Sequence, residues 1–341
     1  MVGCNRCAAI PLLLVAAMLL FQGWGSCFFF SQQVAQTTLE VRGSHLSALP
    51  LVQPGRVCTE SWYRSSELED TFHGNPDALT ADWTSSCETL ERFDSNHTWI
   101  ERIQNNSYRD SDYKIFSTLC RAGFPAQVIE PLAGVLRDPR FNCSRGGGAY
   151  LGVKEYLILA DSADFPPQPG TKRIFFDAGG TRFGDQLMWF ATAYEKRGLP
   201  LDEIYVWEVK NISDEQYWQN VPQQLYNRFH PVLTRYNAVG ISDAVGDRNN
   251  PMTLVYEKCR PQDFCVFKLD VDTSWLENAV AGQLVNDPGN LKEFFFEHHV
   301  QTLQLAQWWG PPGTHSGLTI RHSYDLFARM RQKGVRAHSW I

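Results

Sequence analysis

The sequence predicts an α/β fold in which a doubly wound, mostly parallel sheet occupies the C-terminal half, behind an irregular and helical N-terminal region that contains cysteines. From residue 171 onward, short apolar runs alternate with segments of helical periodicity, which is typical of parallel strands joined by crossover helices. A segment with three prolines, residues 163–170, precedes this part and reads as a linker, because proline is not tolerated inside a helix or a central strand.

The expected strands are the apolar runs at residues 174–176, 204–207, 239–241, 264–269 and 294–296, followed by a last strand within 334–340. Helical periodicity occurs at residues 186–196, 214–228, 274–285 and 323–333. Ser213 and Gln216 have the spacing of a capping box before the second of these helices, and Gly334 follows the last one as a C-cap. In the N-terminal region, the apolar spacing of residues 125–136 also predicts a helix.

The first 30 residues predict a secretory leader. Arg6 precedes an apolar stretch from residue 8 to residue 30, and the first acidic residue is Glu40. The pattern is that of a cleaved signal peptide or of an uncleaved signal-anchor (type II topology); a buried helix of a cytosolic protein is the remaining alternative. A leader implies the membrane of the ER or Golgi with the C-terminal domain in the lumen, or secretion if the leader is cleaved.

The cysteines and the glycosylation sequons agree with a lumenal location. An even number of cysteines, six, follows residue 30: Cys58, Cys87, Cys120, Cys143, Cys259 and Cys265. The last two are close enough for a local bridge, and the other four are expected to pair among themselves. N-x-S/T sequons occur at Asn96, Asn105, Asn142 and Asn211. We therefore divide the chain into a leader (1–30), a stem and cysteine-containing region (31–170) and a C-terminal domain (171–341).

Composition excludes several classes of protein. The 31 basic and 37 acidic residues give a net charge of −6, so there is no electrostatic reason to expect nucleic-acid binding. A hydrophobic content of 43% with 13% aromatic residues excludes a disordered chain. Beyond the leader the cysteines are not spaced in CxxC pairs, which argues against a structural zinc site.

Acidic residues, glycines and histidines follow the predicted strands. Ligands of doubly wound sheets bind beyond the carboxyl ends of the strands, where the strand order reverses. The candidate residues, in chain order, are Asp177, Gly179, Gly180, Glu208, Asp243, Asp270, Asp272, Glu297, His298 and His299. Glycines after a strand let the backbone approach a ligand closely, and an acid after the second strand can accept hydrogen bonds from the two hydroxyls of an adenosine ribose.

Three segments carry a resemblance to a known family. Residues 177–181, Glu208, and residues 267–272 followed by Glu277 resemble the class I S-adenosylmethionine-dependent methyltransferases, most closely the FkbM-like branch. The resemblance covers about residues 171–341 and implies a Rossmann-like fold and methyl transfer to an acceptor such as a small molecule, a glycan or a lipid. Residues 294–299 and 338–340 are also similar to a group of eukaryotic methyltransferase-like membrane-anchored proteins. The sequence departs from the family in its glycine spacing and in Thr273, where a glycine is usual.

The resemblance also implies roles for the candidate residues. Asp177, Gly179 and Gly180 would approach the methionine part of S-adenosylmethionine, Glu208 would bind the ribose, and Asp243 would meet the adenine. Asp270, His298 or His299 would be the base that takes the proton of a hydroxyl acceptor.

A rival interpretation uses the same residues differently. Asp270 and Asp272 form a D-x-D pattern after an apolar strand, which in a lumenal protein suits a glycosyltransferase that binds Mn²⁺ or Mg²⁺ and a nucleotide sugar. Glu297 or His299 would complete the coordination. A non-catalytic protein that keeps the methyltransferase fold is the third possibility.

Overall fold

The computed structural model describes residues 56–109, 112–145, 148–309 and 317–340, which belong to one compact unit, Pro50–Ile341. The predicted leader and the first part of the predicted stem lie outside the described residues. Within the described ranges, no helix combines the length and the apolar character needed to cross a membrane.

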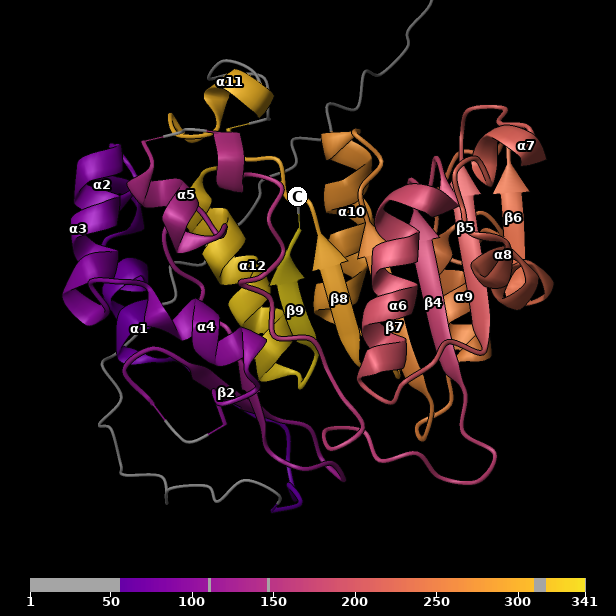
Figure 1. Ribbon diagram of the computed structural model, residues 1–341, viewed down its shortest axis with the longest axis horizontal. Coiled ribbons are helices and arrows are strands. Elements are labelled where there is room, and N and C mark those ends of the chain that lie inside the picture. The colour runs from indigo at the N-terminus through magenta and orange to yellow at the C-terminus, as the bar shows by residue number, and fades with distance from the viewer. Residues whose placement is uncertain (1–55, 110–111, 146–147, 310–316, 341) are drawn as a thin grey trace, which may run out of the picture. The chain divides into compact units, whose positions relative to one another are not determined.

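Six parallel strands form the main sheet of this unit, in the order β6-β5-β4-β7-β8-β9 (Figure 1). Their bounds are Arg173–Ala178 (β4), Glu203–Glu208 (β5), Leu233–Asn237 (β6), Phe264–Leu269 (β7), Glu293–Phe296 (β8) and Arg336–Ser339 (β9). The chain builds outward from β4 to β6 and then returns to place β7 on the other side of β4. The predicted doubly wound α/β fold is therefore confirmed, with the strand order reversing between β4 and β7.

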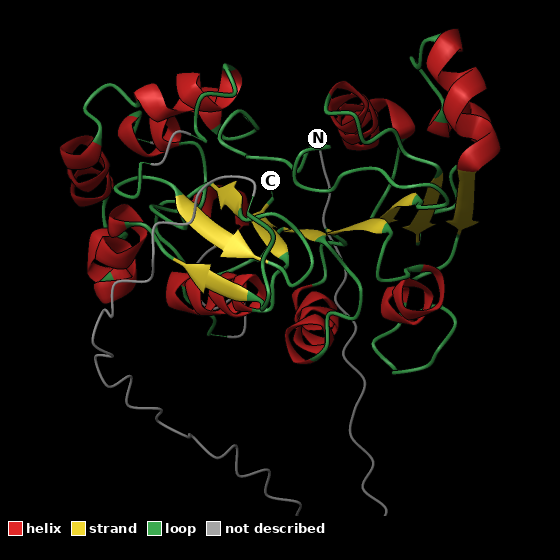
Figure 2. Ribbon diagram, turned by 90° about the horizontal axis from the view of Figure 1, so that it is seen from below, coloured by secondary structure: helices red, strands yellow, loops and turns green. Residues whose placement is uncertain are grey.

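Helices cover both faces of this sheet (Figure 2). On one face lies α6 (Met188–Lys196), whose Phe190 packs against Phe175 of β4 and Phe295 of β8, with ring centroids 4.9 and 4.7 Å apart. On the other face lie α9 (Pro251–Lys258), α10 (Ser274–Asn286) and α12 (Ile320–Gln332), which contact one another in series (Figure 1). Gly334 follows α12 with φ +76°, a conformation that favours glycine.

Two of the predicted elements in this half differ from the structure. The predicted helix 214–228 is two helices, α7 (Asp214–Tyr217) and α8 (Gln223–Phe229), because Pro222 interrupts it; the capping box at Ser213 is confirmed. A short 3-10 turn, η3 (His230–Val232), follows α8. The predicted strand 239–241 is wrong, because the third strand is β6, which ends at Asn237. This edge strand is half-exposed and therefore lacks the continuous apolar character of the central strands.

The N-terminal region contains a small antiparallel sheet of β1 (Trp62–Arg64), β2 (Ser117–Cys120) and β3 (Gln127–Ile129). Its helices are α1 (Glu67–Gly74), α2 (Pro76–Leu79), α3 (Trp83–Phe93), α4 (Thr98–Gln104) and α5 (Pro139–Cys143), followed by the 3-10 turn η1 (Gly148–Tyr150). The predicted helix 125–136 is wrong: residues 127–129 pair with β2, and Pro131 could not continue a helix. The predicted local bridge Cys259–Cys265 is confirmed. The other four cysteines pair among themselves, as expected, and the structure shows their connectivity to be Cys58–Cys120 and Cys87–Cys143.

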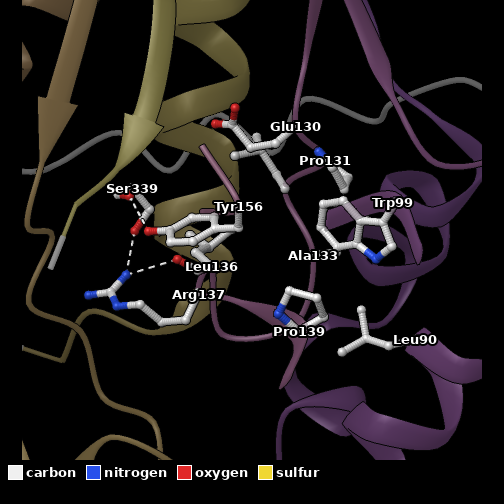
Figure 3. A pocket seen from close by; sticks show the side chains of 11 residues that line it. Leu90, Trp99, Glu130, Pro131, Ala133, Leu136, Arg137, Pro139, Tyr156 and Ser339 are labelled. Atoms are coloured by element: carbon white, nitrogen blue, oxygen red, sulfur yellow. Dashed lines mark hydrogen bonds between the residues drawn. The ribbon is translucent and has the colours of Figure 1, made fainter. Parts of the chain in front are cut away.

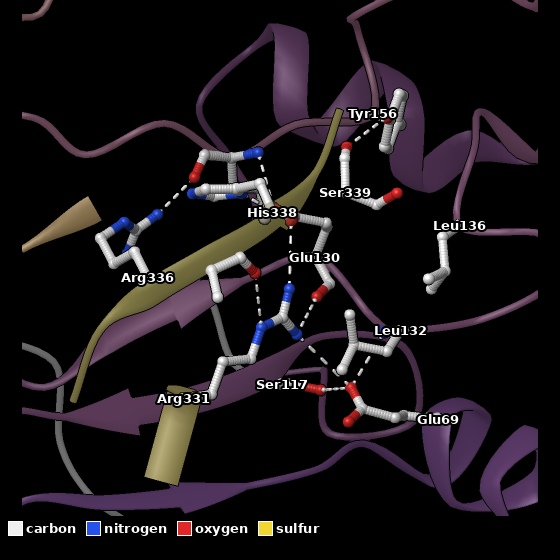
Figure 4. A network of polar contacts seen from close by, with 12 residues as sticks. Glu69, Ser117, Glu130, Leu132, Leu136, Tyr156, Arg331, Arg336, His338 and Ser339 are labelled. Atoms are coloured by element: carbon white, nitrogen blue, oxygen red, sulfur yellow. Dashed lines mark hydrogen bonds and ion pairs between the residues drawn. The ribbon is translucent and has the colours of Figure 1, made fainter. Parts of the chain in front are cut away.

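A buried polar network joins this region to the last helix and strand (Figure 4). Arg331 of α12 donates to the backbone oxygen of Glu130, and its Nη2 lies 3.1 Å from Glu130 Oε1. His338 of β9 lies between two carboxylates, with Nδ1 2.7 Å from Glu130 Oε1 and Nε2 2.8 Å from Glu293 Oε1. Glu69 of α1 lies 3.6 Å from Arg331. The N-terminal region is thus fixed to α12 and β9 by buried charges of both signs.

Apolar packing extends across the same boundary. The predicted linker 163–170 contains neither helix nor strand, yet Phe165 is buried between Phe124 and Phe264, with ring centroids 5.1 and 5.0 Å away. One hydrophobic cluster includes residues from both sides of this segment, from Leu68 to Trp340. The region before residue 171 and the parallel sheet therefore share a core.

Candidate functional site

A cavity of about 300 Å³ opens at the carboxyl edge of the sheet, where the strand order reverses. It is lined by Asp177 of β4, by residues that follow β4, β7 and β8, and by the π-helical turn η2 (Phe183–Leu187). Six of the candidate residues line it: Asp177, Gly179, Gly180, Asp270, Asp272 and Glu297. With Asp185 the lining contains five carboxylates but one basic side chain, that of Arg182. The cavity is therefore suited to a cationic ligand.

A buried lysine organises the middle of this edge. Lys268 of β7 lies directly across from Asp177 of β4, and its Nζ is 3.2 Å from Asp177 Oδ1 and 3.1 Å from Asp270 Oδ2. Burial disfavours the ammonium, but the two carboxylates outweigh this effect and hold the pKa of Lys268 above its usual value. Burial raises the pKa of Asp177, whereas Lys268 keeps the pKa of Asp270 below its usual value despite burial. Lys268 thus holds the carboxylates of two candidate residues, Asp177 and Asp270, in place.

The two glycines are required by the packing of the neighbouring loops. Gly179 has φ +99°, and a Cβ there would lie 1.6 Å from the backbone oxygen of Asp270. A Cβ on Gly180 would lie 2.4 Å from Cγ1 of Val206. The missing side chain of Gly179 therefore lets the loops after β4 and β7 meet beside the cavity, and that of Gly180 leaves room for Val206 of β5.

Glu208 and Asp243 lie outside the cavity lining. Glu208 ends β5 and is buried; its Oε2 accepts a hydrogen bond from Thr181 Oγ1 (2.9 Å) and its Oε1 accepts one from Lys210 N (2.7 Å). Thr181 lines the cavity, so it links Glu208 to that space. Asp243 is exposed in the loop after β6, six residues beyond the strand end. The structure brings Glu208, but not Asp243, next to the candidate site.

Glu297 follows β8 and lines the cavity together with Asp270. Burial, followed by the charge of Asp270, raises the pKa of Glu297 to about 7. Trp309 of α11 (Ala306–Trp309) donates from Nε1 to Glu297 Oε1 at 3.1 Å. A carboxyl group that titrates near neutral pH in a cavity is typical of a functional site.

The side chains of the two adjacent histidines point in different directions. Both lie just beyond β8, which ends at Phe296. His298 turns toward α12, where its Nδ1 is 2.8 Å from Ser323 Oγ, and burial lowers its pKa to about 3. His299 turns toward the cavity side, with Nδ1 3.2 Å from Glu277 Oε2 and Nε2 3.9 Å from Glu297 Oε2. Of the pair, His299 is the one next to the candidate site.

One ligand atom from each of Asp272, Glu297 and His299 lies within 4.8 Å of the other two, a geometry that could hold a metal ion. Asp270, which the sequence placed with Asp272 in the D-x-D pattern, instead pairs with Lys268. Cys87, Glu91 and Cys143 also lie close together, but the two cysteines form a disulfide and are not available as thiolates.

Arg137 reaches this edge from the N-terminal region, between β3 and α5. It is buried, donates from Nη1 to Ser339 Oγ at 2.7 Å, and lies over the ring of Trp309, 5.2 Å from its centroid. It also borders a second cavity, shown in Figure 3, together with Tyr156. That cavity of about 10 Å³ has room for no more than a water molecule.

The sequence offered a signal for some of the functional residues that we did not predict. Lys268 is the one charged residue in the apolar run 264–269, and a charge within a buried strand demands a partner. Nothing in the sequence brings Arg137 to the site, since it does not follow a predicted strand. Comparisons with protein-family models, with curated proteins and with solved structures find no match to this chain.

Proposed function

We propose that the protein transfers a methyl group from S-adenosylmethionine to an acceptor bound in the cavity at the carboxyl edge of the sheet. The observation that carries this proposal is the lining, with five carboxylates and one arginine. S-adenosylmethionine presents a sulfonium and an ammonium, which these carboxylates attract. The diphosphate of a nucleotide sugar or a dinucleotide would meet the same carboxylates with a repulsion that a cation must first offset.

Glu208 supports the proposal from the neighbouring strand. Each of its carboxylate oxygens accepts one hydrogen bond within the protein and retains a lone pair for a ribose hydroxyl. Thr181 holds the carboxylate of Glu208 beside the cavity. Gly179 and Gly180, which precede it, keep the loop after β4 free of side chains. These residues would hold the nucleoside and methionine parts of the cofactor.

Asp270 lines the cavity beside the glycine loop and is the proposed proton acceptor. When bound, S-adenosylmethionine would supply an activated methyl group for an acceptor oxygen, with the sulfur as the leaving group that keeps the electron pair. Asp270 takes the proton that the acceptor hydroxyl loses, and the cavity walls orient the hydroxyl toward the methyl carbon.

Calorimetric titration of the full-length protein with S-adenosylmethionine tests the proposal. We expect saturable binding, weakened about 10- to 100-fold by Glu208→Ala, because hydrogen bonds to a charged carboxylate contribute about 1.5–3 kcal/mol. Glu215→Ala, which removes an exposed carboxylate at the start of α7, is the matched control and should leave the affinity unchanged. Absence of binding by the folded protein would refute the proposal.

The metal-dependent glycosyltransferase is the second candidate, and the ligand geometry of Asp272, Glu297 and His299 favours it. The same titration with nucleotide sugars in the presence of Mn²⁺ separates the candidates: binding of a nucleotide sugar but not of S-adenosylmethionine would replace the first proposal. If the folded protein binds neither ligand, the non-catalytic alternative is supported.

The proposed location is the secretory pathway. The disulfides, one of which joins residues 62 positions apart, indicate an oxidising environment of the secretory type. We propose that the leader anchors the protein in the ER or Golgi membrane with the cavity in the lumen, where glycan, lipid and small-molecule acceptors are present. Protease protection of the C-terminal region in intact microsomes, lost on adding detergent, would support this topology.

A further inference from the structure

Three side chains with different chemistry meet beside the proposed methyl-transfer cavity. Asp272 comes from the loop between β7 and α10, whereas Glu297 and His299 come from the loop after β8. One ligand atom of each lies within 4.8 Å of the other two. Ligand atoms bound to one metal ion lie about 3–4 Å apart, since metal–ligand bonds measure about 2.0–2.3 Å. Small side-chain rotations therefore suffice to bring the three atoms onto one ion.

Groups outside this set orient two of its members. Glu277 of α10 is buried; its Oε1 accepts a hydrogen bond from Val271 N (2.8 Å), and its Oε2 lies 3.2 Å from His299 Nδ1. This carboxylate therefore holds the loop that carries Asp272 and also positions the ring of His299. A carboxylate behind the far nitrogen of an imidazole is the usual support of a metal-binding histidine. On the other side, Trp309 holds Oε1 of Glu297, whose Oε2 is directed toward His299.

The distribution of charge is an independent observation. Of the two buried cations at this edge, Lys268 pairs with Asp177 and Asp270, whereas Arg137 donates to Ser339 and lies over the ring of Trp309. In the part of the chain that the structure describes, no lysine or arginine lies within ion-pair distance of the carboxylates of Asp272 or Glu297. Both carboxylates line the open cavity. Two acids that face a cavity without a lysine or arginine in ion-pair contact create a local field that attracts a mobile cation.

We propose that Asp272, Glu297 and His299 bind a divalent transition-metal ion at the acceptor side of the cavity. One imidazole and two carboxylates suit Mn²⁺ or Zn²⁺ better than Ca²⁺, which prefers oxygen ligands alone. Three protein ligands leave coordination positions that face the cavity. Resting on the proposed function, this assigns the acceptor to compounds that coordinate through oxygen, by a hydroxyl or a carboxylate. The ion would hold the acceptor oxygen in place while Asp270, outside the ligand set, takes the proton.

Calorimetric titration of the full-length protein with Mn²⁺, without S-adenosylmethionine, tests the metal site separately from the proposed function. We expect one ion per chain and at least a tenfold weaker affinity in Asp272→Asn and in His299→Gln. Asp272 is exposed, so its substitution leaves the fold intact. Glu277→Gln should weaken binding about 10- to 100-fold, the effect of losing such a support. Asp185→Asn, which removes a carboxylate of the same cavity outside the ligand set, is the matched control and should change the affinity less than threefold.

Electron spin echo spectroscopy of bound Mn²⁺ adds a readout that electrostatic attraction alone would not give. A directly bound imidazole produces a nitrogen-14 modulation, which we expect in the wild-type protein and in Asp185→Asn but not in His299→Gln. Wild-type affinity in both Asp272→Asn and His299→Gln, or a spectrum without nitrogen modulation, would overturn the proposal. The titration contains no cofactor. Failure to bind Mn²⁺ would therefore overturn the metal site alone, and the binding of S-adenosylmethionine would still have to be tested on its own.

Discussion

The buried network around Glu130 predicts a large and pH-dependent effect of one isosteric substitution. Glu130 Oε1 lies 2.7 Å from His338 Nδ1 and 3.1 Å from Arg331 Nη2, and Oε2 accepts a hydrogen bond from Ile158 N. Glu130→Gln keeps the shape of the side chain but removes its charge. Arg331 and His338 would then share the two remaining carboxylates of the network, those of Glu69 and Glu293.

Two arguments give the size of the stability that Glu130→Gln would lose. Burial favours the neutral acid, but His338 and Arg331 together lower the pKa of Glu130 from 4.5 to about 2. At about 1.4 kcal/mol for each pKa unit, the difference of 4.5 − 2, or 2.5, corresponds to about 3.4 kcal/mol in favour of the folded state at neutral pH. Breaking a buried ion pair by removing one partner costs about 3–5 kcal/mol, which agrees.

The sign of the pH dependence follows from the lowered pKa of Glu130. A carboxyl whose pKa is lower in the folded state stabilises the protein above the unfolded pKa, and this stability is lost as the pH falls through 4.5 toward 2. The Glu130→Gln variant lacks this contribution at every pH. The difference in unfolding free energy between wild type and variant should therefore shrink from about 3.4 kcal/mol at pH 7 to about 2 kcal/mol at pH 3.5.

Urea denaturation followed by tryptophan fluorescence, at pH 7 and at pH 3.5, measures both quantities. Glu91→Gln in α3 removes an exposed carboxylate and serves as the matched control, for which we expect a change below about 0.5 kcal/mol. A loss below 1 kcal/mol for Glu130→Gln at pH 7, or a loss that does not shrink on acidification, would refute the reasoning.

Three further predictions concern other sites. Gly179→Ala should destabilise the fold or prevent folding, because its Cβ would overlap the backbone of Asp270, whereas Gly282→Ala in α10, where a Cβ meets nothing within 4 Å, should raise the unfolding free energy by about 0.5–1 kcal/mol in urea titrations. Asn142 is fully buried and hydrogen-bonded to Ser86, so Asn142→Gln should not change the mobility shift produced by a glycosidase after secretory expression, whereas loss of an exposed, occupied sequon should reduce it. Lys268→Met leaves two buried acids without their cation and should lower the urea unfolding free energy by about 3–5 kcal/mol at pH 7, with part of the loss recovered at pH 4 as those acids bind protons.

Much of the sheet could be predicted from the sequence because the central strands are buried on both faces. The runs around Phe175, Val206 and Phe267 are continuously apolar for this reason. The edge strand β6 did not show this signal, since Thr234 is exposed and its neighbours are half-exposed. The apolar residues at 239–241 pack on the core from a loop and so imitate a strand.

The candidate site was predictable to the extent that it depends on strand ends. Parallel strands bring their carboxyl ends to one edge, so Asp177, Asp270 and Glu297 meet in one cavity. The direction of a side chain beyond a strand end depends on loop conformation, which apolar periodicity does not specify. The backbone of Asp272 has φ +55°, and its carboxylate lies near Glu297 and His299 instead of forming a site with Asp270.

The cross-strand pair of Asp177 and Lys268 also restricts how β4 and β7 can align. Sliding one strand by two residues would keep every apolar side chain on its original face, and phenylalanines such as Phe175 and Phe267 distinguish poorly between the two alignments. The same slip would leave a buried ammonium and a buried carboxylate without each other, at a cost of several kcal/mol. The charged pair thereby selects a single register from among apolar alternatives, and that register determines which loops meet at the edge of the sheet.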